Sequence, residues 1–184
     1  MKFYFATLNK NKLRELSDIL EKELISAPLD LYELQTTDLR KLVENKLKQA
    51  YQKLKAPVIV EDTSLYFEAW NELPGPLVKW FLKNFGLEGL VKALSSFENK
   101  SAIAVSCLGF TNDGQKFHFF KDNVKGTIVA PRGSQGFGWD TIFKPIGQPL
   151  TFGEMSYCEK LRFSPRSKVT IKFKHFLKPK VKQK

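Results

Sequence analysis

The first sixty residues alternate between short apolar runs and segments with helical periodicity, and this order restricts the fold more than any other feature. Residues 2–7, 29–34 and 57–61 are predicted strands, whereas residues 9–24 and 39–55 place leucines at helical spacing. Strand–helix–strand–helix–strand order is typical of strands joined by crossover helices that cover a sheet. We therefore expect a layered α/β fold.

The second half of the chain is predicted to add helices and antiparallel strands. A Pro-Gly-Pro turn lies at 74–76, and residues 112–114 (Asn-Asp-Gly) are a hairpin turn signal. Ser164 is expected to cap the last helix, with Pro165 at its first position. The expected elements are helices at 78–85, 87–97 and 164–177, and strands at 102–111, 116–121 and 126–129. The sequence has no internal repeat or linker, which predicts one domain over residues 1–177 with two lobes.

Positive charge is concentrated at the C-terminal end. The formal net charge is +11, but residues 1–159 hold 20 basic and 19 acidic side chains, and no acid follows Glu159. The basic end, with residues 178–184 as a tail, is interpreted either as a solvated segment or as a contact for nucleic acid.

Composition excludes several classes of protein. A hydrophobic content of 42% is too high for a disordered chain, and no apolar run approaches the ~18 residues of a membrane span. Cys107 and Cys158 give neither a disulfide framework nor metal-ligand spacing. A reducing, cytoplasmic location is therefore expected.

A pair of carboxylates, Glu61 and Asp62, follows the apolar run Val58-Ile59-Val60. Two acids at the end of a buried strand indicate a site for a hard cation such as Mg²⁺, which prefers oxygen ligands. The alternative is that Asp62 caps a turn through Thr63. Glu33 ends the preceding predicted strand, and the ends of parallel strands meet at one edge of a sheet.

Two loops have the composition of a nucleotide site. The turn ATLNKNKLRE, residues 6–15, leads from a strand into a helix, whose N-terminal N–H groups favour phosphate, although it lacks the glycines of a Walker loop. In residues 133–143, Phe137 and Trp139 flank Gly138 and are predicted either to stack on a flat ligand or to form an aromatic corner of the core. Asp140 is expected to accept from a base or to orient a basic partner.

Four sequence blocks resemble the inosine triphosphate pyrophosphatase family, which removes non-standard purine nucleoside triphosphates. They are TLNKNKLRE, PVIVEDTSLYFEAWNELPGPLVKWFL, IVAPRGSQGFGWDTIFKP and TFGEMSYCEKLRFSPR. The resemblance covers roughly residues 3 to 177 and is nearest to the eukaryotic branch. It implies a homodimer and a long curved mixed sheet between two α/β lobes with a central nucleotide cleft.

The resemblance also assigns roles to individual residues. It implies Mg²⁺, with Mn²⁺ as the alternative, on Glu33 and Asp62, and it makes Asp62 a candidate to activate water. Lys12 would stabilise the leaving pyrophosphate, and these three residues are the predicted catalytic group. The implied substrate-binding residues are Thr7, Asn9, Lys12, Lys46, Thr63 and Lys79 along the nucleotide, and Phe137, Gly138, Trp139, Asp140, Lys160 and Arg166 around the base.

The chain departs from the family pattern at three positions. Leu8 replaces a glycine, Leu161 replaces an asparagine, and Pro165 replaces a histidine that contacts the base. The expected reaction is Mg²⁺-dependent hydrolysis of ITP, dITP or XTP to the monophosphate and pyrophosphate. The alternatives are a nucleotide-binding homologue with impaired catalysis and a nucleic-acid-binding module that uses the basic C-terminus.

Overall fold

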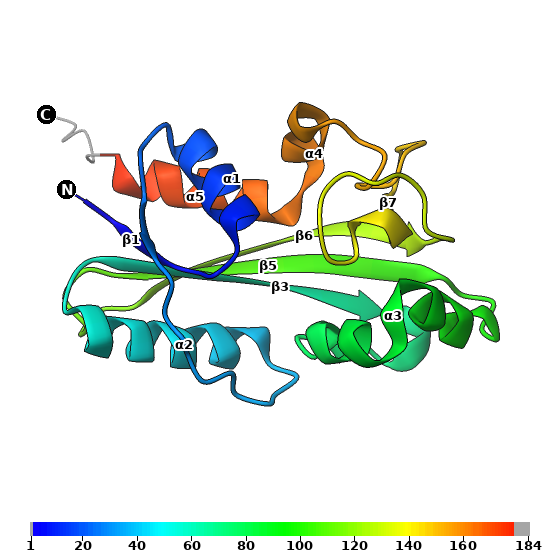
Figure 1. Cartoon of the computed structure of the whole chain (residues 1–184), viewed down its shortest axis with the longest axis horizontal. Coiled ribbons are helices and arrows are strands. Elements are labelled where there is room, and N and C mark those ends of the chain that lie inside the picture. The colour runs from blue at the N-terminus through cyan, green and yellow to red at the C-terminus, as the bar shows by residue number, and fades with distance from the viewer. Residues whose placement is uncertain (1, 179–184) are drawn as a thin grey trace, which may run out of the picture.

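The protein is described by a computed structural model that covers residues 2–178. Its centre is a seven-stranded mixed sheet in the order β2-β1-β3-β5-β6-β7, with β4 paired to β3 (Figure 1). The strands are β1 (Tyr4–Ala6), β2 (Ile25–Ala27), β3 (Val58–Phe67), β4 (Pro74–Gly75), β5 (Ser101–Thr111), β6 (His118–Ile128) and β7 (Phe143–Pro145).

Helices cover both faces of this sheet. In Figure 1, α1 (Lys10–Leu20), α4 (Tyr157–Phe163) and α5 (Pro165–Leu177) lie above it, and α2 (Leu39–Leu54) and α3 (Val78–Ser95) lie below it. The leucine stripes of α1 and α2 pack against the sheet. With Val169 and Phe173 of α5, α1 buries one apolar cluster against β1, β3 and β5, and α2 buries another. The predicted α/β fold is confirmed.

The crossover order of the first half is also confirmed. β1 pairs in parallel with both β2 and β3, and α1 and α2 provide the connections. β3, β5 and β6 are antiparallel neighbours, so the predicted hairpin is present. Its second strand is longer than expected, because the segments predicted at 116–121 and 126–129 belong to the single strand β6.

The strand predicted at residues 29–34 is wrong. The strand beside β1 is Ile25–Ala27, and residues 28–36 have no regular structure. β1 has only three residues, so the sheet offers no further partner after Ala27. The alternation of Leu29, Leu31 and Leu34 instead reflects an irregular segment whose leucines pack against the α2 cluster. The first helix is shorter than predicted, since Glu21 adopts a left-handed conformation (φ 53°) and ends it.

The carboxylates at 61 and 62 lie within β3 rather than at its end. β3 runs to Phe67 and pairs with β5 over its whole length. On its other edge, β1 pairs only with Val58 and Ile59, and β4 pairs with Leu65 and Tyr66. The stretch between these two partners therefore has one free edge, and that edge carries Glu61, Asp62 and Thr63.

Two further predictions concern the helices. The predicted helices at 78–85 and 87–97 form one element, α3, with a kink at Gly86, whose φ of 69° is outside the helical range. The last helix is confirmed: Ser164 accepts a hydrogen bond from Ser167 N, and Pro165 is the first residue of α5.

No helix among the described residues is long and apolar enough to cross a membrane. The division into a domain of residues 1–177 and a basic tail stays a prediction, because residues 179–184 lie outside the described range.

Candidate functional site

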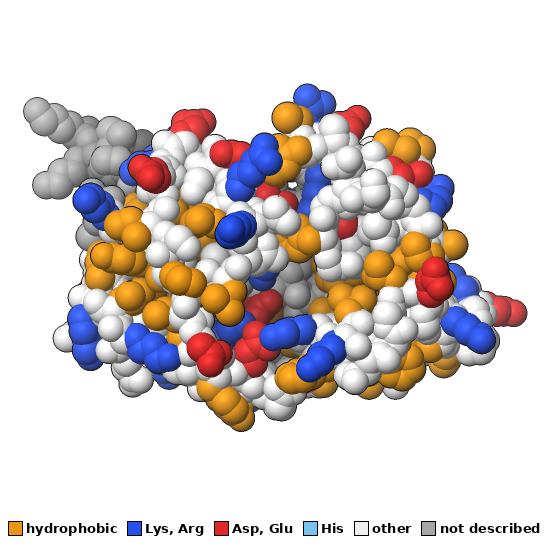
Figure 2. Space-filling model, viewed as in Figure 1, with side chains coloured by type: hydrophobic (Ala, Val, Ile, Leu, Met, Phe, Trp, Pro, Cys, Tyr) orange, Lys and Arg blue, Asp and Glu red, His pale blue; other side chains and the backbone are white. Residues whose placement is uncertain are grey.

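A cleft of about 700 Å³ opens beside the free edge of β3. Its walls come from the start of α1, the segment after β2, the start of α3, the loop before η2 (Asp140–Ile142) and the α4–α5 corner. Figure 2 shows this hollow near the middle of the surface, with acidic and basic side chains meeting at its lower margin. Its size is typical of small-molecule sites.

The cleft brings together every site residue predicted from the sequence, although they come from positions 7 to 166 of the chain. They are Thr7, Asn9, Lys12, Glu33, Lys46, Asp62, Thr63, Lys79, Phe137, Gly138, Trp139, Asp140, Lys160 and Arg166.

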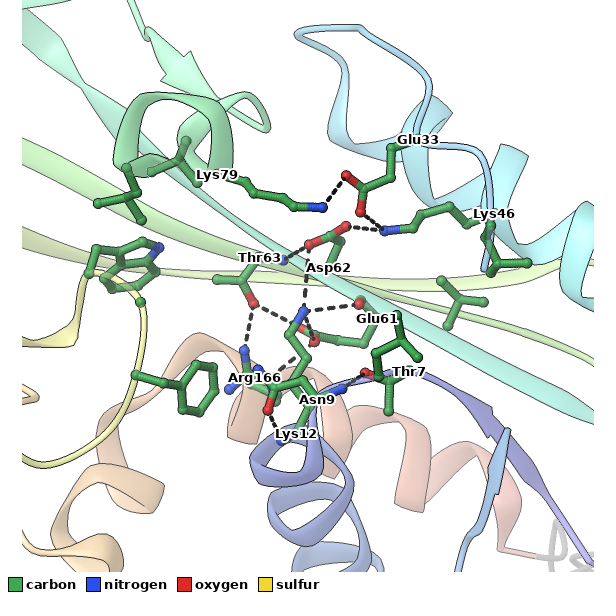
Figure 3. Close-up of a pocket in the computed structure, with 18 of the residues that line it drawn as sticks. Thr7, Asn9, Lys12, Glu33, Lys46, Glu61, Asp62, Thr63, Lys79 and Arg166 are labelled. Carbon is green, nitrogen blue, oxygen red and sulfur yellow. Dashed lines mark hydrogen bonds and ion pairs between the residues drawn. The ribbon is translucent and has the colours of Figure 1, made fainter. Parts of the chain in front are cut away.

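Ten charged side chains of alternating sign form a continuous series of ion pairs across this cleft, most of which is visible in Figure 3. We call this series the ion-pair chain. Its five carboxylates and five cations neutralise one another, so the cleft has no excess positive charge with which to hold a triphosphate. In order, the members are Lys79, Glu33, Lys46, Asp62, Lys12, Glu61, Arg166, Glu15, Lys160 and Asp140.

Lys46 lies between the two carboxylates predicted to hold a metal. Its Nζ is 3.0 Å from Glu33 Oε1 and 2.8 Å from Asp62 Oδ2, and Lys79 Nζ is 2.9 Å from Glu33 Oε2. Within residues 2–178, no three His, Cys, Asp or Glu side chains are grouped to hold a metal ion. Mg²⁺ often takes one or two carboxylates and completes its shell with phosphate oxygens and water. Glu33 and Asp62 fit that role, because their oxygens already face one shared cation.

The lysines keep these carboxylates ionised. Burial alone would raise the pKa of Asp62, but Lys12 and Lys46 outweigh it and hold that pKa below its ordinary value. The same balance applies at Glu33, where hydrogen bonds from Lys79 and Lys46 overcome burial and lower the pKa. Both groups are therefore available as anionic ligands at neutral pH.

Thr7 and Asn9 shape the turn that opens α1. Asn9 N donates to Thr7 Oγ1 at 3.1 Å, and Asn9 Oδ1 accepts from the N–H groups of Asn11 and Lys12 at 2.9 and 3.2 Å. The Asn9 side chain thus caps the helix itself. Lys12 Nζ reaches from this turn to β3, where it lies 3.1 Å from Glu61 Oε2 and 3.5 Å from Asp62 Oδ1.

Arg166 links two buried carboxylates of the ion-pair chain, Glu61 and Glu15. Its Nε donates to Glu61 Oε2 at 3.1 Å, one Nη donates to Thr63 Oγ1 at 3.1 Å, and the other Nη contacts Glu15. Glu61 also accepts from Ser106 Oγ at 2.7 Å. A guanidinium has five N–H donors, so two remain for a ligand.

Glu15, which is not among the residues that line the cleft, is the member of the ion-pair chain that the sequence predictions missed. It is 3% exposed and pairs with both Lys160 (3.2 Å) and Arg166, the two cations predicted to recognise the base. The sequence did contain a signal, because Glu15 lies three positions after Lys12 and therefore shares a helix face with it. Glu61 was predicted only as half of a carboxylate pair for a hard cation, whereas in the structure it is buried and pairs with Lys12 and Arg166.

The aromatic loop forms the predicted corner of the core and also lines the cleft; stacking on a flat ligand stays a prediction. Trp139 is 8% exposed and packs in the core against Phe143, with ring centroids 5.4 Å apart, yet it also lines the cleft. The Phe137 ring instead covers the two cations, with Lys160 Nζ 4.5 Å and Arg166 Cζ 5.1 Å from its centroid.

Asp140 orients a basic partner, one of the two roles expected for it. Its Oδ2 accepts from Lys160 Nζ and from Phe137 N, both at 2.7 Å. Gly136 is required beside it, because an added Cβ would lie 2.2 Å from that same oxygen. Asp140 is therefore occupied within the protein and fixes both Lys160 and the aromatic loop.

Two of the departures from the family pattern lie in the cleft wall. Leu8 is 70% exposed, and φ is positive at four non-glycine residues of the described chain, none of which is Leu8. Its backbone therefore has no conformation that demands glycine. Pro165 is buried beside Arg166 and also lines the cleft.

Comparison with known proteins places this geometry in a family. The model of the Ham1 family matches residues 3–176. The chain belongs to the Ham1 family. It is 45% identical to the inosine triphosphate pyrophosphatase of Saccharomyces cerevisiae over 94% of both chains. It is 41% identical to the protein of the same name from Schizosaccharomyces pombe, over 94% of this chain and 93% of that one.

Solved structures share the fold of this chain. A HAM1 protein from Coxiella burnetii superposes with a TM-score of 0.85 at 23% identity, covering 96% of this chain and 98% of that one. A nucleoside-triphosphatase, dITP/XTP pyrophosphatase, from Mycobacterium abscessus gives a TM-score of 0.74 at 26% identity, covering 96% and 99%. The family resemblance seen in the sequence is confirmed.

Proposed function

We propose that the protein is a nucleoside triphosphate pyrophosphatase that hydrolyses non-standard purine nucleotides (ITP, dITP or XTP) to the monophosphate and pyrophosphate. The observation that carries this proposal is a cleft whose two ends differ in chemistry. The chain belongs to the Ham1 family, and its fungal relatives are named inosine triphosphate pyrophosphatases. One end has carboxylates and lysines suited to a metal-bound triphosphate. The other has Phe137, Lys160 and Arg166, suited to an oxygen-bearing base.

Charge balance supports a divalent metal. The ion-pair chain is neutral, so a triphosphate would bring several uncompensated negative charges into the cleft. Glu33 and Asp62 would hold Mg²⁺, which would neutralise phosphate charge and polarise the phosphoryl group. Mn²⁺ has similar ligand preferences and is the alternative.

The lysines of the ion-pair chain would exchange their carboxylate partners for phosphate oxygens when the substrate binds. Lys12, Lys46 and Lys79 would leave the carboxylates for phosphate oxygens, and Lys12 would stabilise the charge that develops on the leaving pyrophosphate. Lys12 and Lys46 now keep Asp62 ionised, and a bound cation would do the same, so a free oxygen of this carboxylate could accept a hydrogen bond from the attacking water and orient it. The two unused N–H donors of Arg166 would bind a purine carbonyl, at which adenine offers an amino group instead.

Pyrophosphate release decides whether this function is correct. Purified protein with Mg²⁺ should release pyrophosphate and monophosphate from ITP, dITP or XTP, and much less from ATP. No release above a blank from any of the three would refute the proposal. Calorimetric binding of ITP without release would favour the impaired, nucleotide-binding alternative.

Base selectivity should improve when the missing imidazole is restored. Pro165→His adds a side chain with polar atoms beside Arg166, at the base end of the cleft. One hydrogen bond is worth ~0.5–1.5 kcal/mol, so the ITP-to-ATP ratio of kcat/KM should rise by up to about tenfold. Pro165→Ala removes the proline without adding an imidazole and is the matched control. An unchanged or lower ratio in the histidine variant would mean that another residue reads the base.

Assembly and location follow from the sequence and the resemblance. A homodimer is proposed because the resembled family forms one. A cytoplasmic location is proposed because Cys107 and Cys158 are both free thiols. Light scattering of the purified protein would test the dimer.

A further inference from the structure

A second hollow, of about 400 Å³, lies between β6, β7 and the α4–α5 corner. Three of its lining residues are basic: Lys125 from β6, Arg162 from α4 and Lys168 from α5. Ile146, which is 68% exposed, and Phe163 add apolar surface. Among residues 2–178, no acidic side chain lines it. We call it the basic groove.

The cations of the basic groove form no ion pair within residues 2–178, although two carboxylates lie nearby, Asp122 close to Lys168 and Glu159 close to Arg162. Lys168 Nζ donates to the backbone oxygen of Asn123 at 2.9 Å, a neutral partner that fixes the ammonium at the groove. Within residues 2–178, no ion pair joins Lys125 or Arg162 to an acid. The nearby carboxylate of Asp122 is already paired with Lys172 at 2.9 Å.

The ion pairs account for most of the positive charge of residues 160–177. Between residues 160 and 177 there are six basic side chains other than histidine. Lys160 and Arg166 are neutralised in the ion-pair chain, and Lys172 and Lys174 pair with Asp122 and Glu21. The two that remain are Arg162 and Lys168, and both line the basic groove.

We propose that the basic groove binds the phosphate backbone of single-stranded nucleic acid. Cations with no acidic partner attract phosphate, and apolar and aromatic surface beside them supports bases or sugars. Free nucleotides carry the same phosphate chemistry, and the volume accommodates a ligand of that size. A strand engages all three cations through successive phosphates and therefore binds more tightly.

The test is binding of a fluorescein-labelled (dT)15 oligonucleotide to the full chain, followed by anisotropy. Each phosphate contact on a single strand contributes about 0.7 to the slope of log affinity against log salt. Three contacts therefore account for a loss of roughly twentyfold between about 50 and about 200 mM salt. K125Q/R162Q/K168Q should bind more weakly at low salt and lower the slope by about 2, with ITP turnover and melting temperature unchanged.

A second triple variant controls for net charge. K41Q/K48Q/K53Q removes the same charge from α2, on the other face of the sheet, where Lys41 and Lys48 are 72% and 52% exposed. It should bind the oligonucleotide nearly as the unmodified protein does. An equal loss in both triple variants would overturn the proposal, because net charge alone would then explain binding.

Three other results would also overturn it. The first is no binding by the unmodified protein at low salt. The second is loss of binding on Lys12→Gln or on removal of residues 178–184, with no loss in the groove variant, which would place the strand in the cleft or on the tail. The third is displacement by dTMP as effective as by unlabelled (dT)15, which would assign the groove to free nucleotides.

Discussion

Asp62→Asn is expected to lower the turnover of ITP by about 10²-fold or more. The amide keeps the shape of the side chain, and its oxygen can still accept from Thr63 N, as Asp62 Oδ1 does at 3.0 Å. It removes the negative charge that would face both Mg²⁺ and the attacking water. The measurement is kcat with ITP at saturating Mg²⁺, compared with the unmodified protein.

The chain offers a close control for this variant. Asp122 is also paired with a lysine, at 2.9 Å from Lys172, and its side chain is 24% exposed against 22% for Asp62. Asp122→Asn makes the same chemical change outside the cleft and should leave turnover unchanged. Near-normal Mg²⁺-dependent turnover in the Asp62→Asn protein would remove Asp62 from the catalytic group.

Glu61→Ala is expected to lower the free energy of unfolding by about 3–5 kcal/mol. Its side chain has no exposed surface, and it accepts from Arg166, Ser106 and Thr63. Truncation would leave a buried guanidinium short of a counter-charge and two hydroxyls without an acceptor. Urea unfolding, with the midpoint and slope both fitted, measures the loss.

Two controls test whether the stability loss in Glu61→Ala comes from burial of the charge. One removes an exposed ion pair, and the other measures the loss as a function of pH. Glu44→Ala breaks an exposed pair with Lys48 on α2 and should cost well under ~1 kcal/mol. Burial would raise the pKa of Glu61, but Arg166 and Lys12 hold it well below its ordinary value of 4.5. A lowered carboxyl pKa stabilises the fold above pH 4.5, and this contribution is lost as the pH falls. Glu61→Ala should therefore differ most from the unmodified protein above pH 5 and least in acid; a constant difference would contradict the assignment.

Local patterns predicted most of the elements but not the position of the second strand, which is Ile25–Ala27. Leucine periodicity defines α1 and α2, and the Ser164-Pro165 pair marks the start of α5 because capping and proline chemistry are local. Residues 29–34 alternate like a strand and yet lie outside the sheet. A strand needs a neighbouring strand with which to pair. The three residues of β1 are all paired with Ile25–Ala27, and the sequence of residues 29–34 gives no information about this.

The sequence predicted which residues line the cleft, but not which of them form ion pairs with one another. Asp62 and the aromatic loop were singled out by residue type, whereas Thr7, Lys46 and Lys79 were assigned through the family resemblance. The partners of the site residues were not predicted, since Glu15 and Arg166 are 151 positions apart and meet only in the fold. The position of Lys46 between Glu33 and Asp62 likewise depends on an irregular segment and a helix that pack together.

The ion-pair chain also restricts how this sequence can change over evolution. Each member has a neighbour of opposite sign, and the members come from segments spread between Lys12 and Arg166. Removing one charge leaves its neighbours unbalanced, and groups in one network have non-additive effects. A drift to a different substrate would therefore need coordinated substitutions at positions far apart in the sequence, whereas the exposed cations of the basic groove can change one at a time.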